Sequence, residues 1–243
     1  MKKFLGYILS PIAISAFFLL LCIFHPIQWM CYNWGGYKAH KRSVDILNFF
    51  LLHTAYLIFD PVTFINKQSL PAGRPVIFIA NHQSLFDIPP LIYYLRKYHV
   101  KFISKVELTK GVPSISYNLR VGGGANIDRK DPRQSITELV KFAGRMKDNN
   151  WSAAIFPEGT RSKDGSVKPF QSAGVATLLK KCPNALLVPV AIKDSWKMSR
   201  YGFYPLNTLT PMSWTVLEPL EPNGRPADEL VQEVEDRIRA SIG

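Results

Sequence analysis

The sequence predicts an α/β fold: a largely parallel, mixed sheet covered by helices on both faces, preceded by an N-terminal membrane-associated helical segment. Short apolar runs alternate along the chain with segments of helical spacing, which is typical of a parallel sheet with crossover helices. Several of these runs are apolar at nearly every position, as in strands that are buried on both faces. Before them lie two long apolar stretches within the first 65 of the 243 residues.

The first apolar stretch, residues 4–24, contains no charged residue. As a helix it would be roughly 30 Å long, which is enough to cross the hydrocarbon core of a bilayer. Lys2 and Lys3 precede it, but no small-x-small site follows it, so we expect no cleavage as a signal peptide. Pro11 lies inside the stretch and is expected to bend or delay the helix.

The second apolar stretch, residues 44–65, is interrupted by two aspartates and a proline. Basic residues lie between the stretches as well as before the first one, so the positive-inside rule gives no clear orientation. Two membrane arrangements remain open, namely a single spanning anchor or a helix pair that enters one leaflet and returns. The non-membrane alternative is a buried hydrophobic hairpin.

The residues after the second stretch are predicted to alternate between strands and helices. Residues 75–80 are all apolar and lie between Gly73 and Asn81, as expected for a buried strand. Residues 88–97 are predicted to be helical, since their two prolines fall in the first turn. A strand at 100–104, short helices within 106–121 and a strand at 125–128 follow.

The clearest helix start is Asp131-Pro132, with the aspartate as N-cap and the proline at the first helical position. Strands are predicted at 151–156, 185–192 and 213–217, and helices at 172–181 and 227–242. In such a sheet, functional sites lie in the loops past the carboxyl ends of the strands.

The net charge of +12 is unevenly distributed. Residues 96–147 alone carry a charge of +8, which indicates an anionic partner: nucleic acid, anionic lipid headgroups or a phosphorylated small molecule. No nucleic-acid motif or aromatic stacking pattern is present, so we expect no nucleic-acid partner. The three cysteines form neither a disulfide framework nor a metal-binding pattern, and we expect no metal.

Two loops after predicted strands carry the most conspicuous polar residues. In the first, residues 81–87, a loop could bring His82 and Asp87 together, so that the carboxylate fixes the imidazole tautomer and leaves the other nitrogen as a general base. Alternatively, Asp87 only caps the next helix. In the second, residues 156–162, Gly159 permits a positive φ and Arg161 offers a planar fork suited to phosphate. A solvated surface turn is the alternative there.

Together these segments resemble the glycerophospholipid acyltransferases, most closely the 1-acylglycerol-3-phosphate (lysophosphatidic acid) acyltransferases. The first family signature, N-H-x-x-x-x-D, matches residues 81–87, and F-P-E-G-T-R-S matches 156–162 in full. The I-D-R that usually ends the second signature matches 127–129, although residues 122–126 before it are richer in glycine and more polar than usual. The V-P-V-x-I strand matches 188–192. The four blocks occur in family order.

The resemblance implies transfer of a fatty acyl group from acyl-CoA or acyl-carrier protein to the hydroxyl of 1-acylglycerol 3-phosphate. His82 would be the general base and Asp87 its orienting partner, without a cofactor. The residues implied for substrate binding are Glu158, Gly159, Thr160, Arg161, Lys105 and Arg129. The runner-up is a related acyltransferase that acts on glycerol 3-phosphate, another lysophospholipid or a lyso-aminolipid.

The chain is therefore predicted to consist of membrane-associated helices at 1–65 and an acyltransferase catalytic domain at 66–243. The expected partners are membrane lipids, a lysophospholipid acceptor and the acyl donor. The expected location is the inner or cytoplasmic membrane, with the active site on its cytoplasmic side. A rival class, a membrane-anchored binding protein without catalysis, would leave both loops unexplained.

Overall fold

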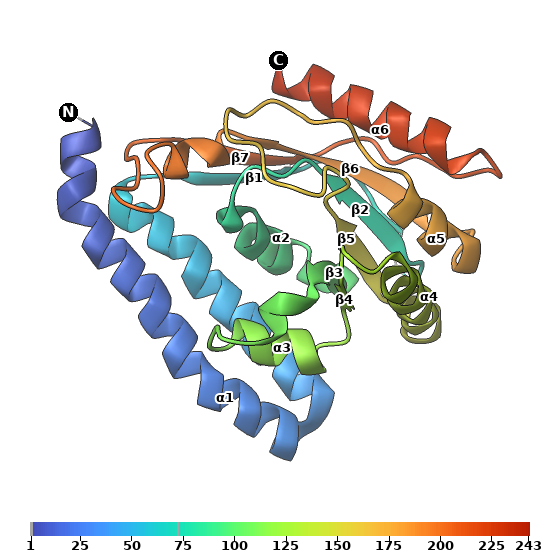
Figure 1. Ribbon diagram of the computed structural model, residues 1–243, viewed down its shortest axis with the longest axis horizontal. Coiled ribbons are helices and arrows are strands. Elements are labelled where there is room, and N and C mark those ends of the chain that lie inside the picture. Colours follow the sequence, from blue (N-terminus) through green and yellow to red (C-terminus); the bar gives the residue numbers. More distant parts are fainter. Residues whose placement is uncertain (1, 72) are drawn as a thin grey trace.

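The computed structural model describes residues 2–71 and 73–243, which build one seven-stranded sheet between two layers of helices (Figure 1). The order of the strands across the sheet is β1-β7-β6-β2-β5-β3-β4. Their bounds are β1 Val62–Asn66, β2 Val76–Ala80, β3 Val100–Lys105, β4 Ala125–Ile127, β5 Ser152–Ile155, β6 Leu186–Lys193 and β7 Met212–Val216.

Five neighbouring strands, β6, β2, β5, β3 and β4, are parallel. Strand β7 is antiparallel to β6, and β1 pairs in parallel with β7, so these two strands run in the opposite direction. The predicted fold class, a largely parallel mixed sheet, is confirmed. The carboxyl ends of the five parallel strands therefore meet at one edge of the sheet, which we call the carboxyl edge.

Strand β1 was not predicted. Residues 62–65 were assigned to the helical N-terminal segment, but they form the edge strand beside β7 instead. Pro61 cannot continue the preceding helix, and the β-branched Val62, Thr63 and Ile65 favour an extended backbone. The sheet consequently begins before residue 66.

Helices cover both faces of the sheet (Figure 1). Helices α4 Pro132–Asn149, α5 Ala173–Lys181 and α6 Ala227–Ile242 pack on one face, and α1 Lys2–His53 and α2 Ile88–Tyr94 pack on the other. A short helix, α3 Ile115–Val121, contacts α1. The side chain of Asp131 accepts hydrogen bonds from the backbone N–H groups of Arg133 and Gln134, which confirms the predicted N-cap of α4.

The central strand β2 shows how the two layers share the core. Val76, Phe78 and Ala80 face the layer of α1 and α2, whereas Ile77 and Ile79 face the layer of α4, α5 and α6. All five residues are at most 3% exposed. Both faces of the strand are thus covered by apolar side chains, which explains why its sequence does not alternate between apolar and polar residues.

Helix α1 consists of two arms that reverse direction at Gly36, the only described residue within it whose backbone is not helical (φ 69°, ψ −168°). The arms lie side by side, because Leu21 and Phe24 of the first pack against Leu47 and Leu51 of the second (Figure 1). We call this pair the helical hairpin. It is followed by a short 3-10 helix, Thr54–Ile58.

The helical hairpin is part of the packed fold, because Leu52 near its end, and Ala55 and Ile58 of the 3-10 helix that follows it, belong to the core that covers the sheet. Its outer surface is different: only 22% of its most apolar 18-residue window is buried, and Phe18 and Leu19 are more than half exposed. This segment is long and apolar enough to cross a membrane. Pro11 does not delay the helix, which begins at Lys2 and runs through it.

Candidate active site

The predicted catalytic and substrate-binding residues lie at the carboxyl edge of the sheet. His82 follows β2, and residues 158–161 follow β5. Lys105 is the last residue of β3, and Arg129 comes two residues after β4. Since these four strands are adjacent and parallel, residues that are up to 79 positions apart in the chain lie at one edge.

His82 and Asp87 form a hydrogen-bonded pair, with 2.8 Å between Nδ1 and Oδ2. A turn of 3-10 helix, Leu85–Asp87, brings them together, and the hydroxyl of Ser84 caps this turn by accepting from the N–H of Phe86. The alternative weighed for Asp87, a cap of the next helix, is not found: its side chain makes no cap hydrogen bond to the described residues of α2 and instead accepts from the backbone N–H of Ser84, within the capping box of the 3-10 turn. Ser84 is a buried cap residue.

The carboxylate of Asp87 is completely buried, and four donors converge on it. Oδ2 accepts from the imidazole and from the backbone N–H groups of Gln83 and Ser84, and Oδ1 accepts from the hydroxyl of Ser195 at 2.5 Å. These bonds compensate the buried charge and leave the carboxylate a single orientation. Because an ionised carboxylate only accepts, we assign the proton of the imidazole to Nδ1, which leaves the lone pair of Nε2 available.

The imidazole is also held from the side. The ring of His82 stacks on Phe156, with 4.1 Å between the centroids and 17° between the planes. Its side chain is 16% exposed, so it is accessible to a substrate at the protein surface. Among the residues that the structure describes, Nε2 has no hydrogen-bond partner. The arrangement suits a general base whose free nitrogen faces outward.

The second loop is bonded directly to the first. Glu158 Oε1 accepts from the backbone N–H of His82 at 2.9 Å, and the N–H of Ser162 donates to the carbonyl of His82 at 2.7 Å. Both backbone groups of the histidine are thus held by the loop after β5. Glu158 Oε2 is buried and has no partner within the described ranges 2–71 and 73–243. Burial raises the pKa of Glu158 to about 7.

The remaining predicted binding residues surround this loop. Gly159 has a φ of 70°, and nothing described lies within 4 Å of where its Cβ would be. The guanidinium of Arg129 donates to the carbonyl of Gly159. The side chains of Thr160 and Arg161 are exposed, and the hydroxyl of Thr160 accepts from Lys168, at 3.0 Å. In the described part of the chain, the guanidinium of Arg161 makes no hydrogen bond or ion pair.

Lys105 is exposed at the end of β3 and pairs in register with Ile127, two residues before Arg129. It contacts neither His82 nor Asp87 through any described hydrogen bond. The structure therefore brings His82, Asp87, Glu158, Gly159 and Arg129 into a connected network. Lys105, Thr160 and Arg161 lie at the same edge as exposed groups facing solvent.

Sequence reasoning missed two residues of this network. Ser195, in the connection after β6, reaches Asp87 from 108 positions away, and nothing in its local sequence distinguishes it. Asn81 was matched only as part of a motif. Its amide donates to the carbonyl of Ile192 and accepts from the N–H of the same residue, both at 2.8 Å, and so fastens the loop to β6.

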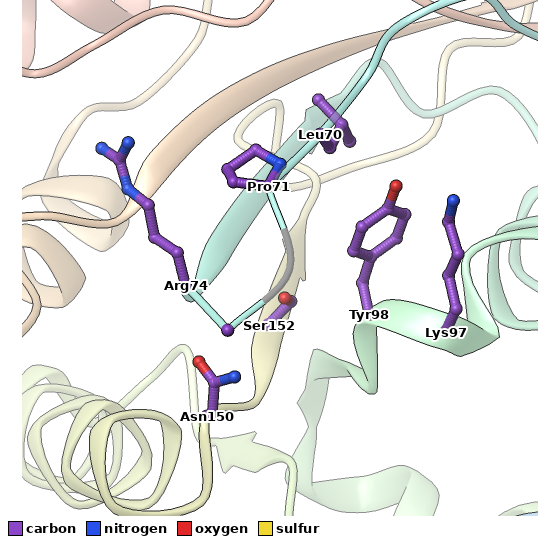
Figure 2. A pocket seen from close by; sticks show the side chains of 8 residues that line it. Leu70, Pro71, Arg74, Lys97, Tyr98, Asn150 and Ser152 are labelled. Atoms are coloured by element: carbon purple, nitrogen blue, oxygen red, sulfur yellow. The ribbon is translucent and has the colours of Figure 1, made fainter.

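A cavity of about 210 Å³ lies at the opposite, amino edge of the sheet (Figure 2). Arg74, Tyr98 and Ser152 line it, and these residues precede or begin strands β2, β3 and β5. It is smaller than the roughly 300–1,000 Å³ typical of small-molecule sites. It is also separated by the length of the strands from the His82–Asp87 pair, so we do not assign it to the site.

Comparison with known proteins agrees with the motifs. Residues 61–193 match the Acyltransferase family. A chloroplast 1-acyl-sn-glycerol-3-phosphate acyltransferase of Brassica napus is 30% identical over 176 residues, covering 72% of this chain and 49% of that protein. The human alpha form of an enzyme with the same designation is 26% identical over 202 residues, covering 83% of this chain and 69% of that protein.

The chain belongs to the acyltransferase family. Its fold is that of a solved 1-acyl-sn-glycerophosphate acyltransferase, PlsC from Thermotoga maritima, with a TM-score of 0.80 and 22% identity over 99% of this chain and 96% of that one. The predicted family is confirmed. The chain spans about half the length of the first plant relatives that it matches.

Proposed function

We propose that this acyltransferase moves a fatty acyl group from acyl-CoA or acyl-carrier protein to the free hydroxyl of 1-acylglycerol 3-phosphate, giving phosphatidic acid. The observation that carries this proposal is the His82–Asp87 pair, held at the carboxyl edge and bonded through the His82 backbone to the loop of Arg161. The proposed base and the proposed phosphate-binding residue follow adjacent strands at the same edge of the sheet, which suits an acceptor with a hydroxyl and a phosphate.

In this mechanism, Nε2 of His82 takes the proton of the acceptor hydroxyl as its oxygen attacks the thioester carbonyl. Asp87 holds Nδ1 and stabilises the positive imidazolium that forms. When the tetrahedral intermediate collapses, the carbon–sulfur bond breaks and the thiolate takes the proton from the imidazolium. The products are an ester and a free thiol, and the histidine returns to its starting state without an acyl-enzyme.

The phosphate of the acceptor is proposed to bind Arg161, whose exposed guanidinium presents a planar fork of donors. Lys105 and Arg129 lie at the same edge and add positive charge. The positive φ of Gly159 and the open space beside it let the backbone approach a ligand closely. Glu158 and Thr160 complete this proposed binding loop.

We further propose that the helical hairpin lies in one leaflet of the cytoplasmic membrane, with the active site on the cytoplasmic side. Its arms reverse at Gly36, so a single crossing does not fit their antiparallel packing. Exposed apolar side chains such as Phe18 and Leu19 would be buried in lipid there. Removing a long-chain lipid from a bilayer costs about 0.8 kcal/mol per CH₂, and an enzyme immersed in the leaflet avoids this cost.

The reaction is tested by incubating the purified protein with a labelled acyl thioester and a panel of acceptors. We expect 1-acylglycerol 3-phosphate to give labelled phosphatidic acid. Preferential acylation of glycerol 3-phosphate, another lysophospholipid or a lyso-aminolipid would replace the proposed acceptor. Parallel reactions with acyl-CoA and acyl-carrier protein identify the donor.

The membrane arrangement is tested by cysteine labelling of Lys2→Cys and Lys38→Cys in a background that lacks the three native cysteines. We expect an impermeant reagent to label both positions from the cytoplasmic side only. Labelling from opposite sides would show that the first arm spans the membrane.

A further inference from the structure

The connection between β6 and β7 leads away from the site and lies across the first turns of α1 (Figure 1). Four hydrogen bonds join the two segments. Two of them connect Tyr204 Oη to the carbonyl of Tyr7, at 3.0 Å, and the N–H of Leu206 to the hydroxyl of Ser10, at 2.8 Å. The others connect Thr208 and Leu209 to Lys2, both at 3.0 Å.

Two residues of α1, Gly6 and Pro11, allow this contact with the β6–β7 connection. Pro11 has no N–H to donate to the carbonyl of Tyr7, four residues earlier, and the Tyr204 hydroxyl donates to that carbonyl instead. At Gly6 a Cβ would lie 2.3 Å from the carbonyl oxygen of Leu206, so only glycine allows this close approach. The connection is therefore fixed to the helix at a defined position.

This junction presents exposed aromatic and apolar side chains from both segments. Phe203 is 73% exposed and Phe4 is 71% exposed, although both are large hydrophobic residues. We call the exposed group the junction patch; it consists of Phe4, Tyr7, Ile8, Tyr201, Phe203 and Tyr204. The patch continues directly into the exposed apolar surface of the first arm of the helical hairpin.

The charge around the junction patch is positive. Lys2 and Lys3 begin the helix, Lys3 lies over the ring of Tyr201 at 5.2 Å, and Arg200 precedes that tyrosine. Residues 2–44 and 195–211 contain no aspartate or glutamate. Aromatic rings beside lysine and arginine are typical of protein surfaces that lie at the headgroup level of anionic membranes. A second copy of this chain would instead bring two positive patches together.

We propose that the junction patch is a second membrane contact, in which the β6–β7 connection inserts its aromatic side chains among the headgroups of an anionic phospholipid bilayer. This inference rests on the proposed membrane association of the helical hairpin. The connection begins beside Asp87 at Ser195, so the contact would hold the carboxyl edge close to the headgroups, where the acceptor phosphate lies. The bilayer would then be touched by two regions more than 140 residues apart in sequence.

The test places an environment-sensitive fluorophore at Phe203→Cys in the full-length protein without its native cysteines. Matched probes are placed at Leu19→Cys on the hairpin and at Ile136→Cys, a 56% exposed apolar residue of α4 on the other helical layer. Each protein is mixed with vesicles of phosphatidylcholine and phosphatidylglycerol that carry spin labels either near the headgroups or deep in the acyl chains.

We expect the probe at position 203 to shift to the blue and to be quenched by the shallow spin label, while the probe at 136 does not respond. If the probe at 203 behaves like the one at 136 while the probe at 19 is quenched, the junction patch is not a membrane contact and the hairpin association stands. If neither 19 nor 203 responds, the proposed membrane association itself is wrong.

A second measurement uses the native aromatic side chains. Tyr201→Ser combined with Phe203→Ser is expected to weaken vesicle binding about tenfold or more, because each exposed ring contributes apolar area that lipid would bury. Ile136→Ser serves as the control and is expected to bind like the wild type. Unchanged vesicle affinity of the double variant would overturn the inference, provided that its circular dichroism spectrum is native.

Discussion

The carboxyl edge and the helical hairpin differ in which side chains they bury and which they expose. At the edge, a fully buried carboxylate is surrounded by four donors, and the two loops are joined through the backbone of one histidine. On the hairpin, large apolar side chains such as Phe18 and Leu19 remain exposed along a segment that is 22% buried in its most apolar part. One region satisfies polar groups away from water, and the other presents apolar groups to its surroundings.

The two regions should therefore respond separately to substitution. Polar networks at the edge orient reacting groups, so changes there should alter turnover or substrate affinity. The outer face of the hairpin makes few contacts within the chain, so changes there should alter membrane binding. The inner face of the hairpin is a third case, because Ala13 and Leu52 cover the sheet and cannot be removed without exposing the core.

The substitution that should lower activity most is expected to leave membrane binding unchanged. His82→Ala should lower turnover about 10²–10⁴-fold, since it removes the proposed base. Flotation with vesicles should be unchanged, because the histidine lies at the carboxyl edge and not on the hairpin. Asp87→Asn should also lower turnover by disturbing the imidazole. Wild-type turnover of His82→Ala in a purified assay would eliminate the proposed mechanism.

A change of Arg161 should affect affinity for the acceptor. Arg161→Lys keeps the charge but loses the planar fork, and should raise the KM for the acceptor by about 10-fold, with a larger rise for Arg161→Ala. The KM for the acyl donor should change little. Steady-state kinetics with each substrate varied in turn measures both. A rise in the donor KM alone would move the phosphate site toward Lys105 or Arg129.

Ser195 is predicted to be a positioning residue that acts through Asp87. Ser195→Ala removes the donor that holds Oδ1 of Asp87, so the carboxylate orients the imidazole less firmly, while its less compensated charge stabilises the imidazolium more strongly. We expect kcat to fall about tenfold, with unchanged KM values, and the acid limb of the pH profile to move to higher pH. Ser195→Thr should restore both. The control is Ser199→Ala, at the other end of the short 3-10 helix Ser195–Ser199. If Ser195→Ala leaves the acid limb of the pH profile unmoved, its contact with Asp87 is purely structural.

Glu158 allows a test by stability rather than by rate. Its pKa is raised to about 7 by burial, from a usual value near 4.5, so between these pH values the folded protein holds a proton that the unfolded chain releases. The protonated carboxyl therefore favours folding below pH 4.5, and this contribution is lost as the pH rises through 7. Glu158→Gln should increase the free energy of unfolding by about 1–3 kcal/mol at pH 8 and leave it unchanged at pH 4. Denaturant titrations measure both values, and an equal change in the free energy of unfolding at pH 8 and pH 4 would contradict this prediction.

Two smaller effects compare helical glycines, one in the helical hairpin and one in α4. Gly6→Ala should destabilise the protein by about 1–3 kcal/mol, because the added methyl group meets the backbone of Leu206. Gly144→Ala, within α4, should instead stabilise it by about 0.5–1 kcal/mol, because no described atom outside the helix's own backbone lies within 4 Å of where the added Cβ would be. Thermal unfolding measures both. Equal shifts of the same sign would mean that the β6–β7 connection does not clamp the hairpin.

Much of the fold could be predicted because the relevant signals are local. Buried parallel strands appear as apolar runs, and the N-cap at Asp131 depends on residues two and three positions away. Strand β1 was missed because its five residues adjoin an apolar helix and resemble its continuation. The sequence leaves both a spanning anchor and a helix pair possible and does not indicate the reversal at Gly36, because a glycine within a helical segment does not specify a backbone angle.

The acyltransferase family, the two motif loops and the strands that carry them could be read from the amino-acid sequence. The folded chain was needed to show that β7 runs antiparallel to β6, that Glu158 accepts from the backbone N–H of His82, and that the hydroxyl of Ser195 donates to Asp87. Each of these contacts joins residues that are between 20 and 108 positions apart. Periodicity and capping act over a few neighbouring residues, so they can be recognised in the sequence. Strand order and the hydrogen bonds of a buried carboxylate depend instead on which distant segments the packed core brings together.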